Sequence, residues 1–224
     1  MKIKKLSSIT SFLIIISVLC LLTSCNTKNE KTENKAIVQD SITKTEAIPL
    51  KAPVEVKDDT LISALSKEVL MSLKKKDYKA FTALFHPIQG VRFSPYASVD
   101  TTYDLVFKAA DFIKQLGQKK KINWGPYSAG EEEIIMTAPE YLKQFVYNAD
   151  FLNAEKTSLN DMIGGGTTHN NLVELYPNCP FTESYFSGFE KKFDGMDWCS
   201  LRLVFKKHLD KYYLIGIVHD QWTT

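Results

Sequence analysis

Two arginines are the side chains of this sequence best suited to recognise a ligand. The chain holds 28 lysines and arginines together, but only Arg92 and Arg202 are arginines, and each interrupts an apolar, strand-like run. A guanidinium forms planar, bidentate hydrogen bonds to a carboxylate or a phosphate, which an ammonium group cannot do. Arg202 therefore has two interpretations, an anion-binding pocket or an internal ion pair. The candidate partners of an internal pair are Glu174, Glu183, Asp194 and Asp220.

Aromatic residues near the expected strand ends favour the pocket. Small-molecule sites are mostly apolar and contain a few polar groups that orient the ligand. We therefore expect a curved sheet to enclose a site for a small anionic ligand, without a cofactor. The predicted ligand-binding residues are Arg92, Tyr96, Tyr185, Arg202, His219 and Trp222.

A histidine and an aspartate stand together in the last expected strand. His219 and Asp220, with Ser200 in the neighbouring strand, have the residue types of a nucleophilic site, but no nucleophile-elbow sequence accompanies them. An alternative is an enzyme that uses His219 or Asp220 as a general base beside Arg202, which requires a pocket open at that end of the sheet. The four histidines lack the short spacing of a metal motif, so no metal site is expected. No residue is assigned a catalytic role.

A C-terminal hairpin must position most of these residues. Alternating apolar residues predict two antiparallel strands joined by a two-residue turn at Leu209-Asp210. In the register set by that turn, Arg202 and His219 share one face of the sheet as diagonal neighbours. The expected pairs are Phe205 with Leu214, Leu203 with Gly216, and Leu201 with Val218. Both faces of the second strand are apolar, which predicts a central place in the sheet.

Helical spacing and breaker residues predict the other elements. A helix is expected from the acidic start at Asp58 to about Lys76, and Asp77 can cap a second one. A third helix is expected before Gly117, although 105–107 could equally be extended, and a capping box at Thr137 opens a fourth. Further strands are expected at 91–93, 122–127, 134–136, 172–176 and 181–187. The expected fold class is α+β, with N-terminal helices packed on a curved antiparallel sheet that ends in a long C-terminal hairpin.

A run of three glycines, Gly164 to Gly166, precedes two threonines. A phosphate-binding loop would end in Gly-Lys-Ser/Thr and open a helix, but this run lacks that ending. A strand is expected to follow it over 172–176. The glycine run is therefore not expected to bind phosphate.

Two cysteines, Cys179 and Cys199, fall in the expected domain. If the strand 181–187 pairs with the strand that begins at Cys199, the two cysteines lie about 26 Å apart, at roughly 3.3 Å per residue. A disulfide requires Cα atoms within about 7 Å. Two free and mostly buried thiols are expected.

The first 25 residues indicate export. A short basic stretch precedes an apolar run, which is the order of a secretory signal. The sequence Leu22-Thr23-Ser24-Cys25 resembles the lipobox of bacterial lipoproteins, which implies that Cys25 bears a lipid. The expected organisation is a lipoprotein signal peptide at 1–24, the lipidated cysteine and a flexible tether at 25–59, and a single domain at 60–224. The domain would then lie outside the cytoplasm, anchored to the cell membrane or the outer membrane.

The bulk composition limits the possible partners. The 224 residues are 44% hydrophobic and carry a net charge of +2, which suits one well-formed core. Many lysines lie in the leader and tether, so the folded part is close to neutral or acidic. We therefore expect no binding to nucleic acid. A third possible function, that of a structural or partner-binding envelope protein, would require an exposed apolar patch on the outer face of the sheet.

Four segments resemble a family of uncharacterised bacterial lipoproteins. They are GVRFSPYASVD at 90–100, YLKQFVYNADF at 141–151, and GMDWCSLRLVF with GIVHDQWT at 195–205 and 216–223. The resemblance covers the chain from about residue 61 onward and implies location and architecture rather than chemistry. The expected order of helices and sheet also resembles the NTF2-like (cystatin-like) architecture, which hosts both enzymes and binding modules.

Overall fold

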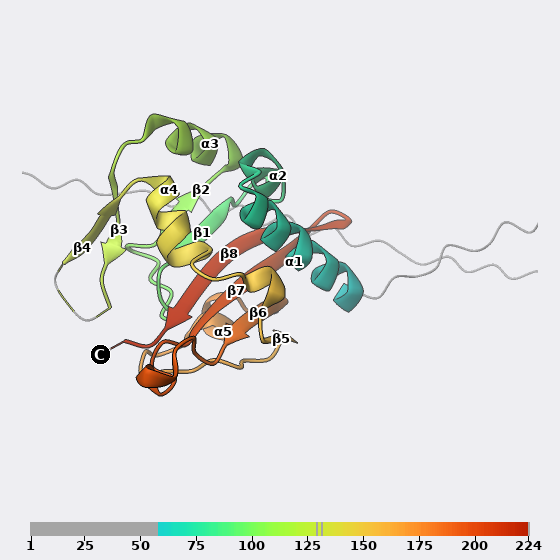
Figure 1. Ribbon diagram of the computed structural model, residues 1–224. Helices are drawn as coiled ribbons and strands as arrows, with labels where there is room; N and C mark the ends of the chain where they lie inside the picture. Colours follow the sequence, from blue (N-terminus) through green and yellow to red (C-terminus); the bar gives the residue numbers. More distant parts are fainter. Residues whose placement is uncertain (1–57, 129, 131, 224) are drawn as a thin grey trace, which may run out of the picture. The chain divides into compact units, whose positions relative to one another are not determined.

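The computed structural model describes residues 58–128, 130 and 132–223 (Figure 1). The predicted signal peptide, Cys25 and most of the predicted tether lie outside these residues. The helices are α1 (Asp58–Lys75), α2 (Tyr78–Ala83), α3 (Ala109–Gln118), α4 (Ala138–Tyr141) and α5 (Leu172–Leu175), with a π-helical turn at Leu142–Val146 and 3-10 turns at Phe151–Asn153 and Lys191–Phe193. The strands are β1 (Val91–Ser94), β2 (Leu105–Phe107), β3 (Ile122–Pro126), β4 (Glu133–Met136), β5 (Lys156–Leu159), β6 (Phe181–Phe186), β7 (Cys199–His208) and β8 (Lys211–Gln221). Among the helices of these described residues, none has the length and apolar character needed to cross a membrane.

The predicted helix boundaries follow local chemistry. The buried residues of α1 recur at helical spacing, and two aspartates in its first turn and two lysines in its last turn suit the helix dipole. Asp77 caps α2, because its side chain accepts a hydrogen bond of 3.0 Å from the N–H of Ala80. The predicted capping box of Thr137 and Glu140 opens α4.

Six strands form one curved sheet in the order β2-β1-β8-β7-β6-β5, and β3 pairs with β4 in a separate hairpin. Neighbours in the large sheet are antiparallel except β1 and β8, which run parallel. β8 is central, as predicted, and β2 takes the segment 105–107 that the sequence left undecided. The predicted fold class is confirmed, with N-terminal helices on a curved, mostly antiparallel sheet that ends in a long hairpin.

The β7–β8 hairpin has the predicted turn but a different register beyond it. Phe205 pairs with Leu214 as expected, and a β-bulge then places Val204 opposite Gly216. One extra residue in β8 moves the following side chains to the other face. Two predicted pairs are therefore wrong, because the partner of Leu203 is Ile217 and the partner of Leu201 is His219.

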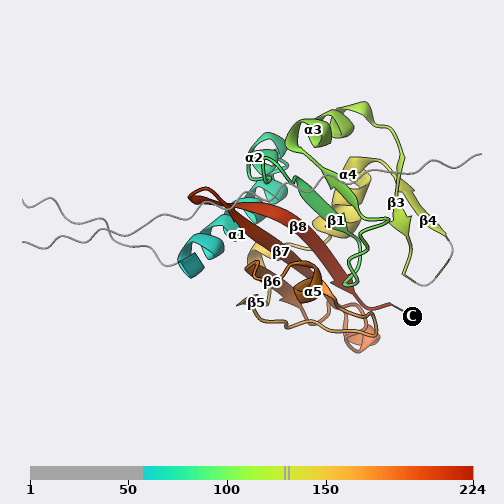
Figure 2. The same cartoon turned by 180° about the vertical axis from the view of Figure 1, so that it is seen from behind.

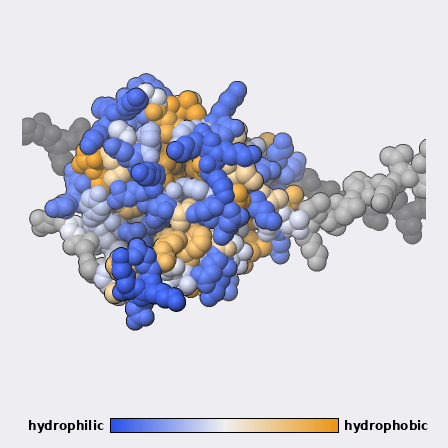
Figure 3. Space-filling view, viewed as in Figure 1, coloured by the Kyte–Doolittle hydropathy of each residue, from blue (hydrophilic) through white to orange (hydrophobic). Residues whose placement is uncertain are grey.

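Helices cover one face of the sheet, called here the helix-covered face (Figure 1). The Ser66 hydroxyl of α1 lies 2.8 Å from the Thr182 hydroxyl of β6, and Trp124 and Tyr141 stack with ring centroids 3.9 Å apart. Large buried aromatic side chains fill the space between helices and sheet; they include Phe81, Phe93, Phe112, Trp124, Tyr141 and Phe145. Figure 3, viewed as Figure 1, shows a mainly hydrophilic surface with hydrophobic residues in separate patches.

The segment 160–180, which contains α5, covers the opposite face, called here the loop-covered face (Figure 2). The prediction of a strand over 172–176 is wrong. The N–H groups of Leu175 and Tyr176 donate to the carbonyls four residues earlier, those of Asn171 and Leu172, which closes a single helical turn. Under this segment the sheet residues Val204, Ile215 and Val218 are buried, so they form no exposed apolar patch of the kind that the partner-binding hypothesis requires.

Candidate functional site

Arg202 lies in a buried ion network on the loop-covered face. Its side chain is 0% exposed, and its Nη2 lies 3.0 Å from Glu183 Oε1. Nη1 donates to Asp220 Oδ2 at 3.0 Å, and Nη2 also donates to the carbonyl of Gly164 at 2.8 Å. Burial raises the pKa of Asp220, and the attraction of Arg202 opposes that shift. This geometry is that of the internal ion pair, and the network uses both terminal nitrogens of the guanidinium, Nη1 and Nη2.

The glycine run closes this network. The N–H groups of Ile163 and Gly164 donate to the Glu183 carboxylate at 2.6 and 3.1 Å. A β-carbon at Gly164 would stand 3.0 Å from both Glu183 Oε1 and a ring carbon of Trp198, so a larger residue would push the loop outward. These N–H groups therefore bind the carboxylate of Glu183 rather than an anion from outside the protein.

His219 lies on the helix-covered face, opposite to Arg202. The bulge pairs it with Leu201, and its side chain is 0% exposed. Its Nδ1 lies 3.3 Å from the carbonyl oxygen of Pro95, and its ring lies 6.0 Å from that of Phe145. Burial lowers the pKa of His219 to about 4, although the Pro95 carbonyl acts in the other direction. The prediction that Arg202 and His219 share a face is wrong, because β8 contains the extra residue of the bulge.

The general-base hypothesis requires an open pocket beside these residues. His219 and Ser200 are each 0% exposed, and Asp220 is 2% exposed and paired with Arg202. His219 and Asp220 also point to opposite faces, because successive side chains of a strand alternate. The residues Ser200, His219 and Asp220 therefore do not converge on one open site.

The three predicted aromatic residues lie in separate places. Tyr96 is buried, and its ring centroid lies 5.9 Å from that of Phe145. Tyr185 packs against Trp198 with centroids 6.0 Å apart. Trp222 follows β8 and is 41% exposed. The six residues predicted to bind a ligand are thus not brought together in one pocket.

Arg92, one of the six residues predicted to bind a ligand, lines an open cavity. Its side chain is half-buried, and its Nη1 donates to the backbone carbonyl of Asp104 at 2.9 Å. The cavity has a volume of about 290 Å³ and is called here the cationic groove. Its lining residues are Gln89, Gly90, Arg92, Val106, Leu175, Tyr176, Pro177, Cys179, Lys206 and Ile215. Two of these are cations and none is acidic.

Tyr176 packs over the sheet where β8 has a glycine. A β-carbon at Gly216 would lie 2.9 Å from the Tyr176 hydroxyl oxygen, so the glycine allows the phenol to approach the strand. Burial raises the pKa of Tyr176 to about 12, against the influence of the nearby Arg92. The phenol is therefore neutral at physiological pH and adds no negative charge to the groove.

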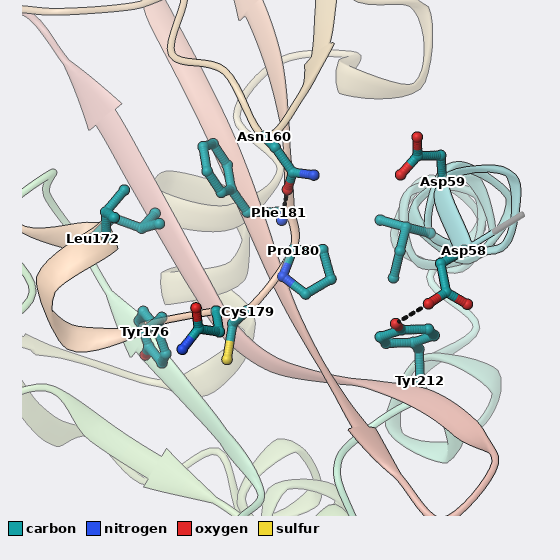
Figure 4. Close-up of a pocket in the computed structure, with 12 residues that line it drawn as sticks. Asp58, Asp59, Asn160, Leu172, Tyr176, Cys179, Pro180, Phe181 and Tyr212 are labelled. Carbon is teal, nitrogen blue, oxygen red and sulfur yellow. Dashed lines mark hydrogen bonds between the residues drawn. The ribbon is translucent and has the colours of Figure 1, made fainter.

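A second cavity, called here the edge cavity, adjoins the cationic groove (Figure 4). It has a volume of about 410 Å³ and shares Tyr176 and Cys179 with the groove. Figure 4 shows Leu172 and Tyr176 on one side and the two aspartates of α1 on the other. Its lining residues are Asp58, Asp59, Ile62, Asn160, Leu172, Val173, Tyr176, Asn178, Cys179, Pro180, Phe181 and Tyr212.

No sequence pattern marks the partners of Arg92 in this groove. Lys206 stands near a strand end, where lysines are usually solvated, and Tyr176 falls in the segment mistaken for a strand. Cys179 and Cys199 are free thiols, as predicted. Within the part of the chain that the structure describes, no three His, Cys, Asp or Glu side chains are placed to hold a metal ion.

Comparison with known proteins adds little to this geometry. No family model and no curated protein matches the sequence. Among solved structures, a designed NTF2-like protein is similar, at 13% identity and a TM-score of 0.27; the comparison covers 72% of this chain and 97% of the other. A similarity this weak carries no argument about function. The functional assignment therefore rests on the geometry of the described residues.

Proposed function

We propose that this chain is a small-ligand binding protein whose ligand is an anion held by Arg92 and Lys206. We further propose that a lipid on Cys25 anchors it at a membrane, outside the cytoplasm. The observation that supports the ligand is the cationic groove, in which a guanidinium and an ammonium group line one cavity without a carboxylate. The anchor is supported by the lipobox-like sequence before Cys25.

The contrast between the two arginines supports this assignment. Arg202 is neutralised by two carboxylates of the protein. Among the described residues, Arg92 forms no ion pair; its Nη1 donates to a backbone carbonyl, and its charge acts on the nearby Tyr176 phenol and Asp104 carboxyl. Arg92 and Lys206 line the same cavity, and an anion bound between them would be stabilised by both positive charges. A bidentate anion would also use the donors that Asp104 leaves free.

Arg92→Ala is expected to weaken anion binding at least tenfold, because a charge-assisted, bidentate contact is lost. The measurement is calorimetric titration of acetate and of inorganic phosphate into the full chain in lipid nanodiscs at low salt, with empty nanodiscs as the reference. Arg92→Lys keeps the charge but not the fork of donors, so it should bind with intermediate affinity.

Lys114→Ala is the matched control, since Lys114 lies on α3 and does not line the groove. It should bind both anions like the wild type. Equal affinities of the wild type and Arg92→Ala for both anions would remove the basis of the proposed function.

Cys25→Ser is expected to move the protein from the membrane fraction to the soluble fraction, because a serine hydroxyl cannot accept the thioether-linked lipid. Cell fractionation in a bacterial host, with metabolic labelling by a radioactive fatty acid, measures both the location and the lipid. Cys20→Ser, within the leader, should keep the label. A labelled Cys25→Ser protein would contradict the anchor.

A further inference from the structure

A second cavity lies next to the cationic groove. Tyr176 and Cys179 line both the groove and the edge cavity, so these two residues stand between the two spaces. The edge cavity is the larger of the two, at about 410 Å³ against about 290 Å³. A ligand anchored at Arg92 would reach the edge cavity by passing the Tyr176 side chain.

The two cavities differ in chemistry. Leu172 and Phe181 give the edge cavity apolar walls near Tyr176 (Figure 4), and Val173 also lines it. Its far end carries Asp58 and Asp59 from the first turn of α1. Charge therefore changes from positive at Arg92 to negative at α1, with an apolar stretch between.

We infer that the ligand is a monocarboxylate with an apolar chain or ring, whose carboxylate lies at Arg92 and whose apolar part lies in the edge cavity. This inference rests on the proposed function and gives the class of its ligand. The apolar part is removed from water by the walls around Leu172 and Phe181. A second carboxylate at the far end of the ligand would meet Asp58 and Asp59 and be repelled.

Titration of acetate, butyrate, hexanoate and adipate into the full chain in nanodiscs, each corrected for empty nanodiscs, tests this class. Affinity should rise about fourfold for each buried methylene from acetate to hexanoate. Adipate, which has six carbons and a second carboxylate, should bind at least tenfold more weakly than hexanoate. Asp59→Asn should reduce that difference, because it removes one of the two repelling charges.

Val173→Trp should flatten the chain-length series, because Val173 lines the edge cavity and an indole at this 61% exposed position would take up part of its space. Ile135→Trp, at an exposed position of β4 that lines neither cavity, is the matched control and should keep the wild-type series. The inference would be overturned if hexanoate bound no more tightly than acetate, or if adipate bound as tightly as hexanoate. Either result would still leave an anion site at Arg92. If neither carboxylates nor phosphate bind, the proposed function itself fails.

Discussion

Arg202→Ala is expected to lower the free energy of unfolding by about 3–5 kcal/mol, because it leaves buried carboxylates without their cation. Glu183 is 0% exposed and Asp220 is 2% exposed, so water cannot replace the guanidinium without opening the glycine loop. Gly164 would also lose the hydrogen bond that its carbonyl accepts. Urea denaturation followed by tryptophan fluorescence measures the loss.

Two variants make this result specific. Arg92→Ala removes the other arginine, which is half-buried and forms no ion pair among the described residues, and should lower the free energy of unfolding by about 1 kcal/mol or less. Asp220→Asn leaves one carboxylate for one guanidinium, so it should destabilise less than Arg202→Ala. Similar losses for Arg202→Ala and Arg92→Ala would show that the network contributes little to stability.

His219 is expected to make the fold sensitive to acid. Its pKa is about 4 in the folded protein, and about 6.5 is its ordinary value in the unfolded chain. The stability that comes from keeping His219 neutral is fully present above about pH 6.5 and is lost as the pH falls through 4. The difference in pKa corresponds to about 3 kcal/mol. Between pH 7 and pH 4, the wild type should lose about 3 kcal/mol relative to His219→Gln, which does not titrate.

Asp104 changes the free energy of unfolding with pH in the opposite direction to His219, so its contribution must be measured separately. Burial raises its pKa to about 6, against hydrogen bonds from Ser94 and Asp100. A raised carboxyl pKa gives stability that is present below about pH 4 and is lost as the pH rises through 6. The wild type alone can therefore show a flat profile, because the two groups offset each other.

Urea denaturation of the wild type, His219→Gln and Asp104→Asn from pH 4 to pH 7 separates the two contributions. Relative to the wild type, Asp104→Asn should gain stability as the pH rises, and His219→Gln should gain it as the pH falls. A difference between the wild type and His219→Gln that does not change with pH would contradict the role given to buried, neutral His219.

The sequence predicted the fold class and most helix boundaries because these depend on local patterns. Alternation in the hairpin, the cap at Asp77 and the box at Thr137 each act within a few residues. The bulge was not predictable in this way. Ile215 and Ile217 are both apolar and both faces of β8 are buried, so the pattern fits either register.

The candidate site was predictable only at its arginine. The rarity of arginine in this chain singled out Arg92 and Arg202, but nothing local distinguishes an arginine that has carboxylate partners from one that does not. Glu183 and Asp220 meet Arg202 through strand pairing, whereas Lys206 and Tyr176 reach the groove at Arg92 from distant segments. The sheet register and the path of the segment 160–180 decide these contacts, and neither is encoded in residue spacing.

The place of β8 between β1 and β7 also sets the order in which the protein can form. β8 comes last among the strands, yet it joins the β1–β2 pair to the other three strands of the sheet. A chain that emerges from a secretion channel N-terminus first could pair β6 with β7 but could not join β1 to them until β8 had followed. Such long-range closure makes folding slow and late, which would suit the export that we propose for this chain.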